Sequence, residues 1–190
     1  MKFVPLEIEG SWIIKSPVNE DNRGFLREWF SWESIQENIG EIFTVKQANI
    51  SCSQRGTLRG IHYSLAKQGQ AKLITCVTGV IQDFIVDIRP NSKTYGKYVA
   101  IELNSTSGES VFIESGLGHA FLSLEHGTTV AYLLSSEYSP AMEYTVNALD
   151  PEIALDFSIE MSDLIMSERD RSAPSLSFRH QEGNLPMSRG

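Results

Sequence analysis

Short runs of β-branched and aromatic residues, separated by turn residues, recur along most of this chain. Glycines such as Gly79, Gly108 and Gly127 stand between the runs. We predict a strand for each of the six clearest runs, at 44–51, 71–77, 80–88, 97–103, 110–113 and 128–134. Many short strands at this spacing indicate an all-β fold, as a sandwich, a jelly roll or a barrel.

Helical patterns are confined to two segments. Ser31 is placed to cap a short helix that has Ile35 and Ile39 on one face and Gly40 as its stop. A second short helix is predicted within 162–170. The pattern predicts a single domain at 1–176, followed by a loose tail at 177–190.

One predicted strand carries polar residues on a single parity, namely Gln47, Asn49 and Ser51. If this face points into a barrel, its amides need hydrogen-bond partners, and a ligand can supply them. The alternative is that the face meets solvent, and periodicity alone favours this alternative.

Composition narrows the class of protein. A chain of 190 residues with 41% hydrophobic residues is one ordinary globular domain. A net charge of -8 argues against a nucleic-acid partner, and a bound anion would need a local basic cluster. We find no apolar run near the ~18 residues of a membrane span and no signal-peptide pattern, so no membrane partner is expected. Cys52 and Cys76 are expected to be reduced, buried thiols in a cytoplasmic protein.

The segment around Gly60 holds the most chemistry. His62 has the ordinary pKa of a general base, but a hydrogen-bonded core histidine fits equally. The guanidinium of Arg59 suits a phosphate, or else a surface ion pair. In strict alternation Arg59 and His62 face opposite sides, so both reach one cavity only if the strand bends near Gly60.

Four other polar residues each have a functional and a structural interpretation. Lys72 interrupts an apolar run. A lysine that points inward is costly to bury unless it forms an ion pair or takes part in catalysis. On an edge strand, its charge would instead prevent aggregation. Tyr132 and Tyr138 can donate protons or simply pack. Asp170 follows Ser167 at capping-box spacing.

A metal site is not expected. His119 follows small residues, as in the second half of the metal-binding cupin motif. The first half requires two histidines one residue apart, and Ser64 stands where the second should be. His62 and His119 alone fall short of the three protein ligands usual for a catalytic metal.

Taken together, these residues resemble the dTDP-4-dehydrorhamnose 3,5-epimerase family. The resemblance covers roughly residues 10 to 176, and its motifs occur in order along the chain. They are Asp21-x-Arg23-Gly24-Phe25 with Glu28, Gln47-x-Asn49-x-Ser51, Leu58-Arg59-Gly60-x-His62-Tyr63, Lys72, Val86-Asp87-Ile88-Arg89, Gly118-His119-x-Phe121, Tyr132 with Tyr138, Pro140 and Glu143, Asp150-Pro151, and Ser167-x-Arg169-Asp170-x-x-x-Pro174.

The resemblance implies a cupin jelly-roll β-barrel with a few short helices. It also implies a homodimer in which strands are exchanged, and a dTDP-4-keto-6-deoxyhexose as substrate. The implied reaction is inversion at C3 and C5 without a metal or redox cofactor.

The resemblance further assigns roles to residues. His62 is the base, Asp170 orients it, Lys72 steadies the developing oxyanion, and Tyr132 is the acid, with Tyr138 as an alternative. Substrate-binding positions are Arg23, Arg59 and Arg169 for the diphosphate, Glu28, Gln47 and Asn49 for nucleotide or sugar, and also Phe25, His119, Tyr138 and Glu143.

Some positions depart from rhamnose-pathway members. The stretch 133–137 lacks the expected Lys, Thr and paired Tyr, Gly118-His119-Ala120-Phe121 replaces Ala-His-Gly-Phe, and Phe157 stands near a usual Trp. Such variants resemble relatives that make deoxysugars for secondary metabolites, and some relatives invert C3 or C5 alone. More distant alternatives are a metal-dependent cupin oxygenase or isomerase and a non-catalytic sugar-nucleotide-binding cupin.

Overall fold

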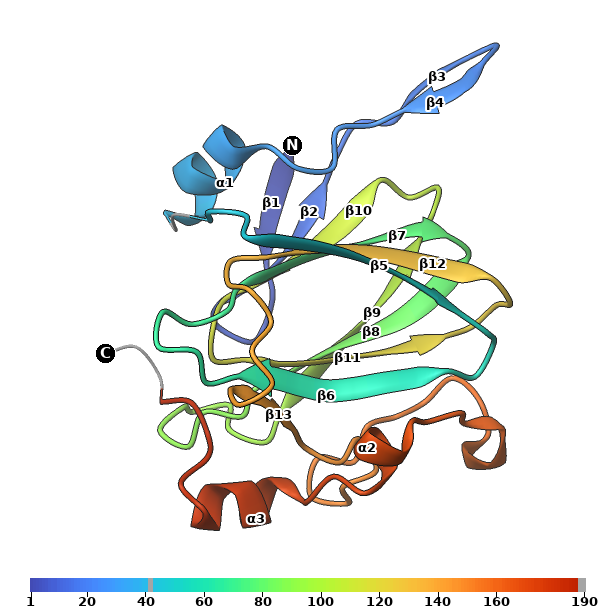
Figure 1. Ribbon diagram of the computed structural model, residues 1–190. Helices are drawn as coiled ribbons and strands as arrows, with labels where there is room; N and C mark the ends of the chain where they lie inside the picture. Colours follow the sequence, from blue (N-terminus) through green and yellow to red (C-terminus); the bar gives the residue numbers. More distant parts are fainter. Residues whose placement is uncertain (41–42, 188–190) are drawn as a thin grey trace.

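Two antiparallel sheets face each other in the computed structural model, which describes residues 1–40 and 43–187 (Figure 1). The first sheet has the order β1 (Lys2–Pro5), β2 (Ser11–Lys15), β10 (Glu109–Ile113), β7 (Lys72–Thr78), β12 (Thr128–Leu134), β5 (Gln47–Ser53). The second has the order β13 (Glu143–Thr145), β6 (Leu58–Ser64), β11 (Gly118–Ser123), β8 (Val80–Val86), β9 (Tyr98–Asn104). The predicted all-β fold is confirmed.

The six predicted strands are present as β5, β7, β8, β9, β10 and β12, with ends that differ by a few residues. The sequence pattern did not predict the other strands, which are β1, β2, β3 (Asn19–Asp21), β4 (Gly24–Leu26), β6, β11 and β13. Of these, β3 and β4 form a hairpin that projects away from both sheets (Figure 1).

The first predicted helix is confirmed as α1 (Trp32–Ile39). The Ser31 hydroxyl accepts a hydrogen bond from the backbone N–H of Ser34, and Gly40 ends the helix with a φ of 79°. The second is only partly helical, because a 3₁₀ turn η1 (Met161–Asp163) and a short helix α2 (Glu168–Arg171) divide it.

The prediction of a loose tail is wrong for residues 177–187, while 188–190 lie outside the described residues. Helix α3 (Leu176–Gln181) is capped by Ser175, and Leu185 is buried. The Tyr63 hydroxyl donates a hydrogen bond to the backbone carbonyl of Asn184 at 2.7 Å. Packing against β6 therefore orders a segment whose composition alone suggested freedom.

The space between the sheets is apolar in one part and polar in another. Along β7, the inward-facing residues run from Lys72 through Ile74 to Cys76. Ile74 and Cys76 join Val130 and Ile81 in a buried apolar cluster, whereas Lys72 faces a cavity. The polar part is therefore the region to search for a site.

Strand β6 changes its register at Gly60. The pairing of β11 with β6 joins His119 to His62 but Phe121 to Arg59, so β6 has an extra residue there. Gly60 has a φ of +127°, and the following peptide is cis. The extra residue shifts the alternation of side chains, so that Arg59 and His62 line the same cavity.

Gly60→Ala should destabilise the fold by about 2–4 kcal/mol, because it combines strain with overpacking. An added Cβ would lie 2.5 Å from the Cβ of Ala120 and 2.6 Å from the carbonyl oxygen of His119. Gly127 also has a positive φ, but nothing lies within 4 Å of its added Cβ. Urea denaturation of both variants separates the two effects, and equal losses would contradict the steric argument.

The two thiols differ in exposure. Cys76 is buried as expected, but Cys52 is exposed, because it lies on the outward parity of β5. Both are free cysteines. Among the helices in the described part of the chain, none is long and apolar enough to span a membrane.

Candidate active site

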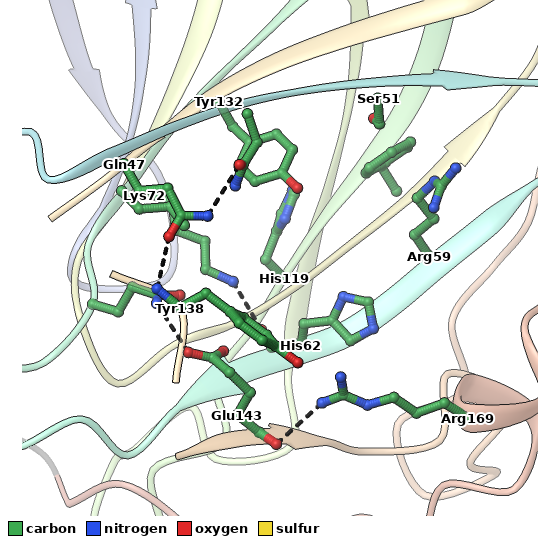
Figure 2. A pocket seen from close by; sticks show the side chains of 14 residues that line it. Gln47, Ser51, Arg59, His62, Lys72, His119, Tyr132, Tyr138, Glu143 and Arg169 are labelled. Carbon is green, nitrogen blue, oxygen red and sulfur yellow. Dashed lines mark hydrogen bonds between the residues drawn. The ribbon is translucent and has the colours of Figure 1, made fainter. Parts of the chain in front are cut away.

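A cavity of about 240 Å³ lies between the two sheets (Figure 2). Both sheets contribute to it, since β5, β7 and β12 of the first face β6, β11 and β13 of the second. The lining residues are Gln47, Asn49, Ser51, Arg59, His62, Gln70, Lys72, His119, Phe121, Tyr132, Leu134, Tyr138, Glu143 and Arg169.

The lining is locally positive on a chain of net charge -8. It contains the cations Arg59, Lys72 and Arg169 but only one carboxylate, that of Glu143. A second hollow of about 440 Å³ shares Arg59, His62 and Arg169 with the cavity. Together, Arg59, Lys72 and Arg169 form the local basic cluster that an anionic ligand requires.

A histidine–carboxylate pair forms one wall. Nε2 of His62 lies 2.6 Å from Oδ1 of Asp170, a side chain that is only 6% exposed. Burial lowers the pKa of His62, and the hydrogen bond to Asp170 opposes this effect in part. Burial alone would raise the pKa of Asp170, but hydrogen bonds from His62 and Ser167 outweigh it and the pKa is lowered. The imidazole of His62 is thus suited to accept a proton near pH 7, at Nδ1, the nitrogen that Asp170 does not engage.

Lys72 lies inside the barrel. Strand β7 is flanked by β10 and β12, so the edge-strand interpretation is wrong. Nζ of Lys72 donates a hydrogen bond to the backbone carbonyl of His62 at 3.2 Å. Burial lowers the pKa of Lys72 to about 8, against the opposing effects of Glu143 and Asp83. A buried ammonium beside the base is suited to stabilise negative charge that develops on a ligand.

Tyr132 and Tyr138 differ in how strongly the surrounding structure encloses them. Tyr132 is part of β12 and packs against the apolar cluster between the sheets. Tyr138 follows that strand, is 53% exposed, and has its backbone N–H bonded to the Gln47 side chain at 2.7 Å. Figure 2 shows Tyr132 across the cavity from His62, on the opposite sheet. Tyr132 is therefore the less exposed of the two tyrosines.

The polar parity of β5 faces the cavity, so the solvent-facing alternative that periodicity favoured is wrong. Gln47 donates a hydrogen bond to the Asn49 side chain at 3.0 Å. The exposed parity carries Ala48, Ile50 and Cys52 instead. Burial of the polar face is possible because the opposing wall is also polar.

The other predicted binding residues of the barrel are held by neighbours. Nε of Arg59 donates to the hydroxyl of Ser53 at 3.2 Å, and Arg169 donates to the backbone carbonyl of Glu143 at 3.1 Å. The Glu143 carboxylate accepts from Gln70 at 3.2 Å. These bonds place both guanidinium groups at the cavity wall.

Three predicted binding residues lie elsewhere. Arg23 and Phe25 belong to the projecting β3–β4 hairpin, and Glu28 follows it. All three are exposed, and Arg23 is paired with Asp21. The structure of one chain therefore does not bring them to its cavity.

Two polar residues of this region were not identified from the sequence. Gln70 supports Glu143 from a loop and has no sequence signal. Asp83 is fully buried and hydrogen-bonded to His119 at 2.7 Å. Its signal is a carboxylate on the same parity as Ile81 and Ile85 of β8. Within the described residues, no group of three or more His, Cys, Asp or Glu side chains could hold a metal.

Comparisons with known proteins show the family to which the chain belongs. The family model described as dTDP-4-dehydrorhamnose 3,5-epimerase matches residues 5–177. A dTDP-4-dehydrorhamnose 3,5-epimerase of Mycolicibacterium smegmatis is 42% identical over 181 residues, which cover 95% of this chain and 89% of the relative.

Two solved structures are similar over nearly the whole chain. NovW, a 4-keto-6-deoxy sugar epimerase from the novobiocin gene cluster of Streptomyces spheroides, aligns with a TM-score of 0.95 at 38% identity, covering 98% of this chain and 93% of that one. A double mutant of ChmJ, a 3'-monoepimerase from Streptomyces bikiniensis, was solved with dTDP; it aligns with a TM-score of 0.91 at 40% identity, covering 96% and 92%. These similarities confirm the expected cupin fold.

Proposed function

The chain belongs to the dTDP-4-dehydrorhamnose 3,5-epimerase family, and we propose that it inverts both C3 and C5 of dTDP-4-keto-6-deoxy-D-glucose. At the coarser level it is a cofactor-independent epimerase of dTDP-4-keto-6-deoxyhexoses, of the 3,5- or the 3-type. The finer proposal rests on the arrangement of His62, Lys72 and Tyr132 around one cavity.

The reaction requires a base and a stabilised enolate. The C4 ketone acidifies the protons at C3 and C5, but they remain far less acidic than imidazolium, and each unit of pKa mismatch costs about 1.36 kcal/mol. Nδ1 of His62 takes the proton while Asp170 stabilises the imidazolium that forms. The ammonium of Lys72 donates to the C4 oxygen as charge develops there.

Inversion requires the new proton to arrive from the opposite face of the sugar. The observation that carries the proposal is the placement of the base and the acid on opposite sides of the cavity. His62 comes from β6 of one sheet and Tyr132 from β12 of the other, across the cavity (Figure 2). The ChmJ variant replaces a histidine and a tyrosine separated by as many positions as His62 and Tyr132. This spacing supports the assignment of these two residues as base and acid.

The nucleotide part of the substrate meets the positive wall. Arg59 and Arg169 line both the cavity and the adjoining hollow, where they are placed to hold the diphosphate. We propose a homodimer in which the β3–β4 hairpin carries Arg23, Phe25 and Glu28 to the cavity of the partner. The projection of this hairpin away from its own barrel supports that exchange (Figure 1).

Inversion at one carbon is the second candidate. Residues 133–137 depart from the rhamnose-pathway pattern directly after the proposed acid. A tyrosine tilted by this segment would reprotonate one carbon correctly and miss the other. The similarity to a 3'-monoepimerase favours C3 as the carbon inverted in that case.

The test is NMR of dTDP-4-keto-6-deoxy-D-glucose incubated with the protein in D₂O and a chelator. We expect deuterium at C3 and C5 with both centres inverted. Exchange and inversion at one carbon would replace the double epimerase by the second candidate. Activity that the chelator removes would indicate a metal-dependent cupin, and binding without exchange would indicate a non-catalytic one.

Tyr132→Phe should impair net inversion more than proton loss, because it removes the opposite-face acid but leaves His62 and Lys72 in place. The measurement compares the initial rate of deuterium exchange with the rate of product formation. Tyr138→Phe is the matched control and should retain both rates. Equal loss of exchange and inversion in Tyr132→Phe would contradict its role as the acid.

The pH profile of kcat/KM should be bell-shaped. Activity rises as His62 loses its proton, with a midpoint below the ordinary value of 6.5, because burial lowers this pKa. Activity falls as Lys72 loses its proton, with a midpoint of about 8. A profile that stays level through pH 8 to 9 would show that the charge of Lys72 is not used.

A further inference from the structure

A second histidine–carboxylate pair lies behind the cavity wall. Nε2 of His119 is 2.7 Å from Oδ2 of Asp83, and both side chains are buried, at 11% and 0% exposure. His119 on β11 is the direct register partner of His62 on β6. The two imidazoles thus enter the cavity from adjacent positions, and each is held at Nε2 by its own aspartate.

Asp83 is costly to bury where it lies. It shares the inward parity of β8 with Ile81 and Ile85, which belong to the apolar cluster between the sheets. Its second oxygen, Oδ1, is buried without a hydrogen-bond partner among the described residues. A buried carboxylate with one oxygen unpaired is expected to lower stability unless its charge is offset.

The charge of Asp83 is offset from two directions. Nε2 of His119 is hydrogen-bonded to it, and the negative charge of Asp83 raises the pKa of Lys72. Glu143 is the other carboxylate that acts on Lys72. Asp83 therefore connects two groups that line the same cavity, although it is not itself part of the lining.

We propose that Asp83 is a positioning residue that orients His119 for the reaction. The inference rests on the proposed function. Because the carboxylate only accepts hydrogen bonds, it keeps a proton on Nε2 of His119. Nδ1 is then the nitrogen that can accept a hydrogen bond from a hydroxyl of the bound sugar. The same carboxylate also raises the pKa of the Lys72 ammonium.

Asp83→Asn tests this with little change of volume. The amide can donate to Nε2 as well as accept from it, so the fixed tautomer of His119 is released. We expect kcat to fall by about 10- to 100-fold, as for other residues that orient a functional histidine through its second nitrogen. The alkaline midpoint of kcat/KM should move below about 8, because one of the two carboxylates acting on Lys72 has lost its charge.

The matched control is Asp87→Asn. Asp87 is also fully buried on the same stretch of chain, but it pairs with Arg89 and with the hydroxyls of Ser92 and Thr94 outside the cavity. This variant should lower thermal stability and leave both kcat and the alkaline midpoint unchanged. A kcat loss of the same size in both aspartate variants would reduce Asp83 to a structural role.

The tautomer can be observed without turnover. In protein labelled with ¹⁵N-histidine, the ring nitrogens of His119, identified by their absence from His119→Gln, should report a proton on Nε2. In Asp83→Asn this pattern should change. An unchanged pattern together with an unchanged alkaline midpoint would overturn the inference.

A double variant completes the test. If Asp83 acts partly through His119, the fold loss of kcat in the double variant Asp83→Asn, His119→Gln should be smaller than the product of the two single fold losses. Independent, multiplicative losses would overturn the link to His119. Lack of turnover in the unaltered protein would instead overturn the proposed function, while the ¹⁵N pattern would still decide whether Asp83 orients His119.

Discussion

Replacement of His62 by alanine should abolish deuterium exchange at both C3 and C5, with a loss of at least about 10³-fold in rate. Lys72 is charged, and Nδ1 of His119 is assigned to a hydroxyl of the sugar, so His62 is the group assigned as the base. A base is needed before any inversion, so both carbons lose exchange together. Exchange is measured by NMR in D₂O, independently of product formation.

The fold should persist in this variant. The His62 side chain is 37% exposed, so its removal leaves no closed cavity. Asp170 loses one partner but keeps the hydroxyl of Ser167 and the backbone N–H of Gly60. Circular dichroism and thermal unfolding check this point.

His126→Ala is the matched control, because His126 is exposed in the turn between β11 and β12. It should retain exchange at both carbons. Turnover near that of the unaltered protein in His62→Ala would remove His62 as the base.

Replacement of Lys72 by methionine should lower kcat by about 10²- to 10³-fold, the usual cost of losing one donor to a developing oxyanion. Methionine has nearly the shape of lysine and no charge, so the cavity keeps its volume. A change confined to KM would instead make Lys72 a binding residue. Exposed Lys67 provides the control, and Lys67→Met should leave kcat unchanged.

The same Lys72→Met variant should be more stable at pH 7, by roughly 1–3 kcal/mol. The pKa of Lys72 falls from 10.5 to about 8 on folding, so its buried charge lowers the stability of the native state. Between about pH 8 and the unfolded value, the unfolded chain binds more protons than the folded one, and the stability of the unaltered protein rises with pH.

The stability difference between Lys72→Met and the unaltered protein should therefore be largest below pH 8 and shrink toward pH 10.5. Urea denaturation at several pH values measures it. A difference that does not depend on pH would show that the gain comes from packing and not from the removal of a buried charge.

Local patterns predicted much of the fold because they depend on neighbours in the chain. Six strands follow from runs of β-branched residues, and α1 follows from Ser31 and Gly40, whose capping bonds span only three or four residues. Local patterns did not predict the order of residues 177–187, because a hydrogen bond from Tyr63 on a distant strand helps to hold this segment.

The features of the candidate site also divide into those that the sequence predicted and those that it did not. The order of motifs along the chain indicated the family, and with it His62, Lys72, Tyr132 and Asp170. Periodicity could not place the polar face of β5, because alternation shows which residues share a face but not what that face meets. The extra residue at Gly60, which turns Arg59 and His62 toward one cavity, depends on contact with Ala120 of β11.

The sequence by itself thus determined the all-β class, the short capped helix and the chemistry available for proton transfer, because these depend on residue type and near-neighbour spacing. Only the tertiary structure decided that His62 and Tyr132 face each other from opposite sheets, that Lys72 lies inside, and that Asp83 stands behind His119. These relations join residues far apart in the chain, and packing between the two sheets brings them together.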